Sequence, residues 1–387
     1  MLTRIAVENY RSLRELVVPL GPLNVVTGAN GSGKSSLYRA LRLLAETAQG
    51  GLIAALAREG GLPSTLWAGP EAGTRGRHAA RHPVQGTIRK GSVSLKLGFS
   101  SEDFGYAIDL GLPSRIDSAF TLDPEIKREC IWAGPVFRRS SVMVDRRGPA
   151  LRATDSDGAW QTIPQTLPTY QSMMSEFSDP RSAPEMTLIR ERVRSWRFYD
   201  HFRTDADAPA RQPQIGTHTP VLSDDGADLA AALQTIREIG DARRLAGAID
   251  DAFPGSSVEI AQAEGRFAVH LSQPGLLRPL KAAELSDGTL RYLLLVAALL
   301  TPRPPDLLVL NEPETSLHPD LLPALARLIA SAARHAQVIV VTHAEALVSA
   351  LGGAAEIAEI RLDNAAGETL IAGQDALDRL PWSWPER

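Results

Sequence analysis

The feature that most restricts the fold is a glycine-rich segment between a predicted strand and a predicted helix. Residues 23–27 are mostly β-branched, and Gly28–Ser35 follows at once with the sequence GANGSGKS. The next residues are apolar at positions 37, 40, 41 and 44, which is helical spacing. The segment satisfies the pattern G-x-x-x-x-G-K-[ST] in full, so the sequence predicts a strand, a phosphate-binding loop and a helix in that order.

Each residue type in this loop suits the binding of phosphate groups. Glycines let consecutive backbone N–H groups curve around an oxyanion, and the following helix presents its positive end to the phosphates. Lys34 is placed to contact the β- and γ-phosphates, and Ser35 offers a hydroxyl to Mg²⁺. The alternative, a glycine-rich turn that binds nothing, is disfavoured because both flanking elements are present.

Composition excludes several classes of protein. The chain has 387 residues, enough for one to three domains, and a net charge of −4, which rules out a histone-like basic protein. Its one cysteine, Cys130, excludes a disulfide framework and a cysteine-based metal cluster. The start of the chain carries Glu8 and Arg11, unlike a signal peptide, and the apolar run 293–300 is too short to cross a bilayer. We expect a cytoplasmic globular protein without a membrane segment.

The predicted secondary structure changes twice along the chain. Strands are predicted in residues 5–20, at 131–136 and 142–144, and in hairpins at 93–110 and 258–271, so an antiparallel sheet is expected over about 62–165. Helices are predicted at 185–202, 228–251, 290–300, 321–333 and 344–351, and an irregular crossing loop at 203–222. Apolar strands at 306–310 and 338–341 lie between helices, with a terminal strand at 356–362, so a parallel sheet covered on both faces is expected there.

Polar residues follow the strand at 306–310. Asn311, Glu312 and Glu314 stand where ligands bind in open α/β sheets, at the carboxyl edge of a strand. Glu312 is predicted to polarise the water that attacks a γ-phosphate. Asn311 stands where an Mg²⁺-associated aspartate is expected, and an amide keeps an acceptor oxygen but loses the charge. The other interpretation of the two glutamates is solvated loop charges.

Two further segments become candidates for function only beside the residues described above. Ser286 and Gly288, in Leu285–Thr289, open a predicted helix and offer a second anion site, although in isolation Ser286 or Asp287 is an ordinary helix cap. His343 follows the strand at 338–341, so its imidazole is expected at the same sheet edge as Glu312.

Taken together, these segments resemble the ATP-binding-cassette (ABC) class of P-loop ATPases. Gly28–Ser35 resembles the Walker A motif, Leu307–Glu312 the Walker B motif with its catalytic glutamate, and Leu285–Thr289 the signature motif. Ser316–His318 resembles the D-loop and His343 the switch histidine. The fold that this resemblance implies is α/β, with a mixed central sheet, an antiparallel β subdomain and a helical lobe.

The opening residues 5–13 are similar to the start of the branch that includes RecF, SMC and Rad50 proteins, in which Arg11 would lie near the nucleotide base. Within it the chain is most similar to stand-alone predicted AAA ATPases and to the ATPase part of overcoming-lysogenization-defect (OLD) nucleases. No sustained heptad is present, so no coiled-coil arm is expected. By motif order the chain has three stretches: lobe I at 1–165, lobe II at 166–290, and a return to the ATPase core at 291–387.

The resemblance implies ATP and Mg²⁺ as cofactors. The residues that it assigns to catalysis are Glu312, His343 and Lys34. Those that it assigns to the nucleotide are Arg11, Asn30, Gly31, Ser32, Gly33, Lys34, Ser35, Ser36, Ser286 and Gly288. Those that it assigns to the metal are Ser35, Asn311 and Gln171, the last as a candidate for the Q-loop glutamine that is equally well a surface residue.

The resemblance also implies a homodimer. The signature serine of one subunit would cap the ATP bound to the Walker A loop of its partner, so ATP would act as a dimer switch in DNA repair or anti-phage defence. A separately encoded nuclease or other effector is a candidate partner. Two alternatives stay open: a nucleotide-dependent scaffold with weak turnover, favoured by Asn311, and the motor subunit of a membrane transporter, disfavoured by the long separation of Lys34 from Ser286.

DNA contact also stays open. One candidate surface is the arginine-rich segment 138–152, and a second is 190–203, where arginines alternate with aromatic residues that could stack on bases. For the second, a helix with core aromatics and solvated arginines is the favoured interpretation. For the first, the two interpretations are equally supported.

Overall fold

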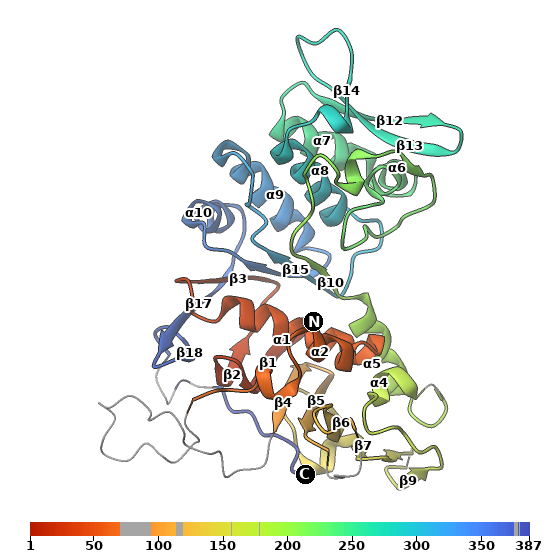
Figure 1. Ribbon diagram of the computed structural model, residues 1–387, viewed down its shortest axis with the longest axis vertical. Coiled ribbons are helices and arrows are strands. Elements are labelled where there is room, and N and C mark those ends of the chain that lie inside the picture. The colour runs from red at the N-terminus through yellow and green to blue at the C-terminus, as the bar shows by residue number, and fades with distance from the viewer. Residues whose placement is uncertain (70–93, 114–118, 156, 178, 375–377, 379) are drawn as a thin grey trace. The chain divides into compact units, whose positions relative to one another are not determined.

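The computed structural model describes residues 1–69, 94–113, 119–155, 157–177, 179–374, 378 and 380–387. The chain forms two compact units that interleave along the sequence (Figure 1). Unit 1 comprises Met1–Leu20, Gly28–Ser195 and Ile360–Arg387, and unit 2 comprises Gly21–Thr27 and Trp196–Glu359. The three stretches expected from the sequence follow the order of the motifs, whereas these units follow the contacts.

Unit 1 is built on one eight-stranded antiparallel sheet in the order β2-β1-β4-β5-β6-β7-β8-β9. Its strands are β1 (Leu2–Tyr10), β2 (Leu13–Pro19), β4 (Leu95–Ser101), β5 (Phe104–Gly111), β6 (Glu125–Ala133), β7 (Val142–Arg147), β8 (Ala150–Thr154) and β9 (Trp160–Ile163). The expected antiparallel sheet and its first hairpin are therefore confirmed, except that Val93 lies outside the described residues.

The central strands of this sheet are buried on both faces. Every residue of β5 is buried, because one face packs toward the helices and the other is covered by the end of the chain. On the second face, Trp132 of β6 packs edge to face against Phe137 and Trp382, with ring centroids 5.3 and 5.8 Å apart. Such aromatic pairs add to the burial of apolar area.

The helices of unit 1 are α1 (Lys34–Gln49), α2 (Leu52–Arg58), α3 (Leu62–Thr65), α4 (Met173–Glu176) and α5 (Pro184–Ser195). Helix α1 buries an apolar stripe that includes Leu37, Leu41 and Leu44, as its spacing predicts. Arg194 of α5 donates to the carbonyl of Ala48 at the end of α1 at 2.9 Å, so these two helices are joined by a polar contact as well.

The expected terminal strand at 356–362 is longer and is not the last one. It is β17 (Ala358–Ala365), and it turns into the antiparallel strand β18 (Glu368–Ile371). The turn has Ala366 and Gly367 with positive φ, which is the backbone that a tight hairpin needs. Thr369 of β18 donates its N–H to the carbonyl of Ser12 at 2.8 Å, which fixes the hairpin within unit 1.

Unit 2 contains four parallel strands side by side, in the order β10 (Arg197–Tyr199), β15 (Leu307–Asn311), β16 (Gln337–Val341) and β3 (Leu23–Gly28). Almost all of their apolar side chains are buried, which confirms the parallel sheet expected from the continuous apolar runs. Because the strands are parallel, their carboxyl ends lie at one edge of this sheet, at Tyr199, Asn311, Val341 and, for the part of β3 that belongs to unit 2, Thr27.

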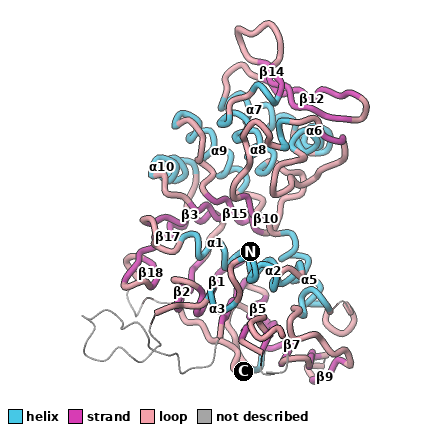
Figure 2. Tube along the Cα trace, viewed as in Figure 1, coloured by secondary structure: helices cyan, strands magenta, loops and turns pink. Residues whose placement is uncertain are grey.

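The helices of unit 2 are α6 (Leu229–Ile239), α7 (Ala242–Ala252), α8 (Asp287–Leu299), α9 (Leu322–Ala332) and α10 (Glu345–Ala354). They contribute most of the unit's core, in which Tyr292, Leu293 and Leu325 of α8 and α9 are fully buried. A smaller antiparallel sheet joins β11 (Gln214–Ile215), β12 (Ser257–Ala263), β13 (Arg266–Ser272) and β14 (Leu280–Lys281), which confirms the second expected hairpin. Figure 2 shows these strands beside the helices.

Two helix predictions are wrong in their extent. The helix expected at 228–251 is two helices, because Gly240 ends α6 and the side chain of Asp241 caps α7 by accepting from the N–H of Arg244. The helix expected at 185–202 ends at Ser195, and Arg197–Tyr199 is instead the strand β10, paired in parallel with β15. Aromatic residues favour strands, and here pairing with a buried neighbour decides the conformation. Among the described residues, no helix combines the length and the apolar character needed to cross a bilayer.

Candidate nucleotide site

The loop of residues 28–35 is shaped by glycines that no other residue could replace without strain. Gly28, Gly31 and Gly33 have φ values of 144°, 81° and 105°. A Cβ on Gly28 would lie 2.3 Å from the carbonyl oxygen of Leu362, and one on Gly33 would lie 2.0 Å from the Oγ1 of Thr369. The loop therefore needs glycine at both positions, for the backbone and for the space.

Polar groups of the loop point to an anionic ligand. Lys34 is 8% exposed, and its Nζ donates to the carbonyls of Gly28 and Ala29 at 2.6 and 3.1 Å. The Oγ of Ser32 is buried and has no hydrogen-bond partner among the described residues. Helix α1 begins at Lys34 and has no acidic residue in its first turn. A buried ammonium, an unpaired hydroxyl and a helix N-terminus together fit the oxygens of a triphosphate.

The other residues that the sequence assigned to this loop lie around it in unit 1. Ser35 and Asn30 are exposed, with Ser35 in the first turn of α1. Ser36 accepts from the Oγ of Ser12 at 3.3 Å, and Gly31 accepts from the Nδ2 of Asn364 at 3.1 Å. The exposed hydroxyl of Ser35 is the group in this set that could reach a cation held by phosphate oxygens.

Arg11 is held by a carboxylate within unit 1. It has φ 50°, and its Nε and Nη2 donate to Oε2 of Glu59 at 3.0 and 2.7 Å. The hydroxyl of Tyr10 donates to the same carboxylate, and burial together with Glu59 raises the pKa of Tyr10 well above its usual value. The role of Arg11 near a nucleotide base stays a prediction.

Gln171 lies in a segment that is anchored by buried charges. Its backbone carbonyl accepts from Nη1 of Arg146, whose Nη2 also donates to the carbonyl of Pro168 at 2.6 Å. Glu129 holds the next residues, since its carboxylate accepts from the Oγ of Ser172 and, at 2.8 Å, from the N–H of Met173. These contacts fix the backbone of Gln171, and its role as a metal ligand stays a prediction.

In unit 2, the carboxyl edge of the parallel strands gathers two glutamates and a histidine. Nδ1 of His343 lies 3.3 Å from Oε1 of Glu312 and 3.6 Å from Oε1 of Glu314. Glu312 has φ 47°, a left-handed conformation that is uncommon for this residue type, and its N–H donates to the carbonyl of Val341 at 2.8 Å. The sequence therefore placed Glu312 and His343 correctly at one edge. Glu314 is buried and accepts from the hydroxyl of Thr342.

A buried arginine contacts the residues at this edge. Arg291 of α8 is 2% exposed, and its Nη2 donates to the carbonyl of Glu312 at 3.0 Å. Burial lowers the pKa of Arg291, while the charges of Glu314, Asp200 and Glu312 act in the opposite direction. This arginine, which the sequence analysis did not single out, fixes the strained backbone of Glu312.

Asp200 is a second residue that the sequence analysis missed. It follows β10, and its Oδ1 accepts from Nδ2 of Asn311, at the end of the neighbouring strand β15, at 2.6 Å. An acid directly after the short run Arg197-Phe198-Tyr199 could have identified it, but that run was included in a predicted helix. The structure thus places a carboxylate next to the amide that stands where an aspartate was expected.

The segment 285–289 opens helix α8 as expected. The Oγ of Ser286 caps the helix by accepting from the N–H of Thr289 at 3.1 Å. A Cβ on Gly288 would lie 2.7 Å from the carbonyl oxygen of Ser316, so the D-loop-like turn packs directly on this glycine. Ser286, Gly288, Ser316 and His318 line an open hollow of about 700 Å³ in unit 2.

Comparison with known proteins decides the family. Residues 23–349 match the family model described as "AAA domain, putative AbiEii toxin, Type IV TA system". This match covers more than half of the chain and includes both the 28–35 loop and the strand edge. The chain belongs to this AAA domain family. It is an ATPase domain of this type, as the sequence motifs predict.

The comparisons also found two kinds of similar proteins. The chain is 46% identical over 44 residues to the OLD nuclease of Thermus scotoductus, a match that covers 11% of this chain and 8% of that protein. A crystal structure of an SMC head bound to the C-terminal winged-helix domain of ScpA has a TM-score of 0.50 at 13% identity, covering 96% of this chain and 97% of that one. An SMC head domain from Thermotoga maritima has a TM-score of 0.49 at 15% identity, with 96% and 98% covered.

The likeness to the first SMC head shows the fold of this AAA domain. It confirms the expected α/β architecture of the ABC-type ATPases, with an antiparallel sheet in addition to the parallel strands. Within the part of the chain that the structure describes, no coiled-coil arm is present.

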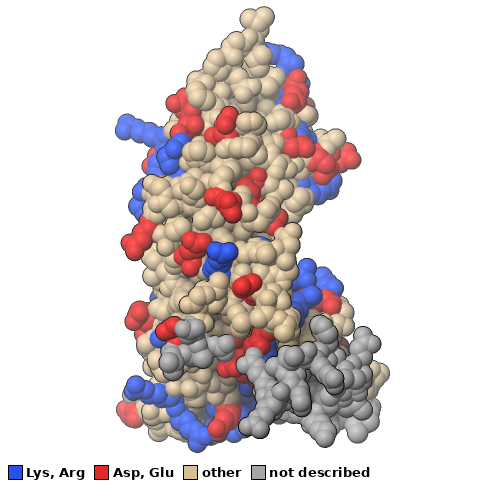
Figure 3. All heavy atoms as spheres, turned by 90° about the vertical axis from the view of Figure 1, so that its left-hand side faces the viewer, with Lys and Arg blue, Asp and Glu red and all other residues tan. Residues whose placement is uncertain are grey.

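The arginine-rich segments of the AAA domain are largely paired. In segment 138–152, Arg146 is completely buried with Glu129, and both Arg147 and Arg152 contact Asp145. The aromatic residues of 190–203 are buried, which confirms their interpretation as core; they are Trp196, Phe198, Tyr199 and Phe202. On the face drawn in Figure 3, basic and acidic side chains are interspersed. Arg146 is thus no part of a DNA-binding surface.

Proposed function

We propose that this AAA domain binds ATP with Mg²⁺ and hydrolyses it, and that ATP controls the pairing of two copies. The observation that carries the proposal is the preformed loop of residues 28–35. It combines glycines in left-handed conformations, the buried ammonium of Lys34 and the unpaired hydroxyl of Ser32. Lys34 donates to two loop carbonyls, and triphosphate oxygens are better acceptors for an ammonium.

The residues at the strand edge of unit 2 supply the proton chemistry of this proposal. Glu312 orients the attacking water and accepts its proton. His343 lies within 3.3 Å of that carboxylate and holds its orientation. Arg291 holds the peptide of Glu312 in place by donating to its carbonyl oxygen.

Asp200 compensates for the amide at position 311. The bound Mg²⁺ supplies charge neutralisation for the phosphates. Asn311 offers that cation a neutral oxygen, and its Nδ2 group is already used by Asp200. With the amide held in this way, its Oδ1 stays an acceptor and the carboxylate of Asp200 supplies the negative charge that an aspartate at 311 would have carried.

The position of Ser286 supports the proposed pairing. The helix N-terminus at Ser286 and Gly288 faces an open hollow lined by the D-loop-like residues, and not the interior of unit 2. An exposed N-terminus of this kind suits a phosphate brought by a second copy. The γ-phosphate then contacts both chains, and its loss on hydrolysis removes the contact across the pair.

The test measures binding and pairing in one series. Mass is determined by size-exclusion chromatography with light scattering, without nucleotide, with ATP and Mg²⁺, and with ADP, for the wild type, Glu312→Gln and Lys34→Ala. We expect ATP to produce a dimer that is most persistent in Glu312→Gln, because hydrolysis falls by roughly 10²-fold or more. Lys34→Ala is expected to bind no ATP and to stay monomeric. Retention of ATP by Lys34→Ala, or a wild type that binds none, contradicts the proposal.

A scaffold with little turnover is the second candidate, and Asn311 favours it. Phosphate release by the wild type and by Glu312→Gln separates the two. Equal and negligible rates, with ATP still bound, support a scaffold, whereas a rate that depends on Glu312 supports a hydrolase.

A role in DNA repair or anti-phage defence, with a separate effector such as a nuclease, is proposed on the similarity to an OLD nuclease over 44 residues. DNA binding is measured by mobility shift with the wild type and with Arg138→Ala/Arg139→Ala, since Arg139 is 83% exposed. A DNA affinity that the double variant leaves unchanged removes this surface from the proposal.

A further inference from the structure

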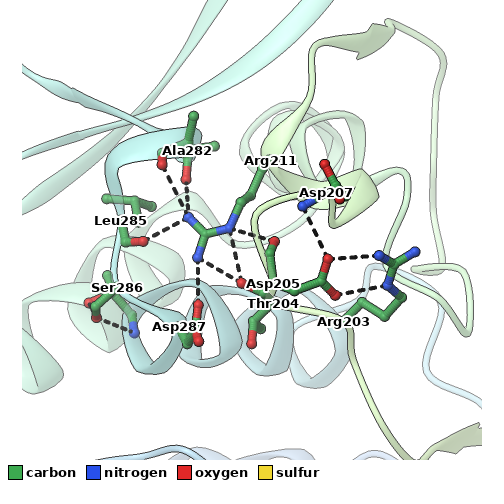
Figure 4. Close-up of polar contacts among 11 residues, drawn as sticks. Arg203, Thr204, Asp205, Asp207, Arg211, Ala282, Leu285, Ser286 and Asp287 are labelled. Atoms are coloured by element: carbon green, nitrogen blue, oxygen red, sulfur yellow. Dashed lines mark hydrogen bonds and ion pairs between the residues drawn. The ribbon is translucent and has the colours of Figure 1, made fainter.

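One buried arginine holds the start of helix α8. Arg211 ends the short helix η2 (Pro209–Arg211) and is 8% exposed. Its guanidinium extends from the crossing loop to the residues just before α8 (Figure 4). It donates to the carbonyls of Thr204 (3.0 and 2.8 Å), Asp205 (3.0 Å), Ala282 (2.9 Å) and Leu285 (2.7 Å), and to Oδ1 of Asp287 (2.7 Å).

These contacts determine where Ser286 lies. The carbonyls of Ala282 and Leu285 belong to the short segment that leads into α8, and Asp287 is the first residue of that helix. Ser286 stands between two residues that the same guanidinium holds. Only the planar fork of an arginine can satisfy several carbonyls and a carboxylate at once, so a lysine could not replace it.

The second effect of Arg211 is electrostatic. Asp287 is an acid in the first turn of α8, which stabilises a helix but repels an anion approaching the same N-terminus. Arg211 bonds to its Oδ1 at 2.7 Å and offsets its charge. Without this pairing, a carboxylate would stand uncompensated beside Ser286 and Gly288, where a phosphate must approach.

The neighbouring arginine provides a comparison within the same loop. Arg203 makes a bidentate ion pair with Asp205 at 2.9 and 2.7 Å, and within the described part of the chain it makes no hydrogen bond to α8. Its side chain is 54% exposed. Arg203 therefore resembles Arg211 in charge and in its link to the loop, but not in its link to Ser286.

We propose that Arg211 is a positioning residue for the ATP-dependent pairing, which it supports by holding Ser286 and Gly288 in place and by neutralising Asp287. The proposal rests on the proposed function, in which these residues contact the nucleotide of a second copy. Arg211 does not touch that nucleotide, so it acts on pairing and hydrolysis and leaves the binding of ATP to the chain's own 28–35 loop unchanged.

The experiment uses Arg211→Gln, Arg211→Gln/Asp287→Asn and the control Arg203→Gln, all in the full chain. Each is examined for binding of a fluorescent ATP analogue to dilute protein and, in the Glu312→Gln background, for ATP-dependent pairing. Arg211→Gln is expected to weaken pairing by roughly tenfold or more, because it leaves Asp287 without its partner. The double variant is expected to recover part of this loss. Arg203→Gln is expected to pair like the parent.

Mixing two impaired variants tests the same idea through hydrolysis. In a pair of Arg211→Gln with Lys34→Ala, the first chain supplies an intact loop at 28–35 and the second an intact Ser286. We expect Lys34→Ala alone to be inactive, Arg211→Gln alone to hydrolyse slowly because it pairs weakly, and the mixture to hydrolyse faster than either variant through one complete site. A misfolded Arg211→Gln chain could not contribute a working loop, so recovery shows a local effect.

The outcomes separate this inference from the proposed function. A parent that neither binds ATP nor pairs overturns the proposed function and this inference with it. A parent that pairs while Arg211→Gln pairs equally well overturns only the role of Arg211. Equal losses of ATP binding and pairing in Arg211→Gln, with no recovery in the mixture, show a general structural role and also overturn it.

Discussion

At the scale of single residues, the candidate site has an amide at the one position where the expected pattern has an aspartate, and a carboxylate lies next to that amide. Asn311 lacks the charge of an aspartate, and Asp200 at the end of the adjacent strand lies 2.6 Å from it. An amide between a carboxylate and a cation can donate to the first with its nitrogen and accept from the second with its oxygen. The pair as a whole thus carries one negative charge, as an aspartate would.

We expect Asp200→Asn to raise the Mg²⁺ concentration that is needed for ATP binding. Adding Asn311→Asp to this variant is expected to restore the wild-type Mg²⁺ requirement. A lost carboxylate next to a metal ligand costs roughly tenfold or more in metal affinity. The measurement is a Mg²⁺ titration of fluorescent ATP binding, with hydrolysis followed in parallel.

Asp205→Asn is the control for this titration, because Asp205 is an exposed acid of the same segment that pairs with Arg203. An unchanged Mg²⁺ midpoint in Asp200→Asn would show that Asp200 only orients the amide of Asn311.

At the scale of elements, the loop before α1 depends on a second element to close it. Gly33 approaches Thr369 of β18 so closely that a Cβ would overlap its side chain, whereas Gly31 has open space around it. Both glycines have positive φ, so a substitution at either position strains the backbone. Only the substitution at Gly33 adds a steric clash.

This difference predicts the order of two glycine variants. Gly31→Ala is expected to cost about 1–2 kcal/mol of loop stability, which is the strain of a left-handed backbone. Gly33→Ala adds the overlap with Thr369 and is expected to abolish ATP binding. Equilibrium binding of ATP, together with urea unfolding of both variants, checks the order. If Gly33→Ala binds ATP as well as Gly31→Ala, the β18 hairpin does not constrain the loop.

At the scale of the whole molecule, a buried network of charged side chains in unit 1 holds the segment 168–173 against the antiparallel sheet. Glu129 and Arg146 are both completely buried, and together they hold the segment 168–173 through its backbone. Tyr106 donates to the same carboxylate at 2.6 Å, and burial beside Glu129 raises the pKa of its hydroxyl well above the usual value. Each buried charge in this network is stabilised by the hydrogen bonds and the opposite charge of its partners.

Removing one charge of this network is expected to destabilise the protein strongly. Glu129→Gln leaves the guanidinium of Arg146 buried without an anion, at a cost of about 3–5 kcal/mol. The exposed pair Arg139–Glu386 is the control, and Arg139→Ala is expected to change stability by about 0.5 kcal/mol or less. Urea unfolding followed by circular dichroism gives both values, and similar midpoints for the two variants would contradict the prediction.

Features that depend on short stretches of sequence were predictable. The glycine pattern of 28–35 restricts its own backbone, the spacing of apolar residues identifies α1, and alternation identifies the hairpin of β4 and β5. The positions of Glu312 and His343 at one edge follow from two buried parallel strands. Gly240 and Phe198 mark where local patterns were insufficient, because a cap and a neighbouring strand decided the conformation there.

The sequence by itself thus determined the glycine-rich loop before α1, the class of fold and the sheet edge at which Glu312 and His343 stand. Only the tertiary structure decided the partners of those residues: Asp200 for Asn311, Glu59 for Arg11 and Arg211 for Asp287. The physical reason is range. Backbone sterics and helical or strand periodicity act within a few residues, whereas an ion pair between side chains far apart in sequence exists only where strand pairing and a buried core bring them together.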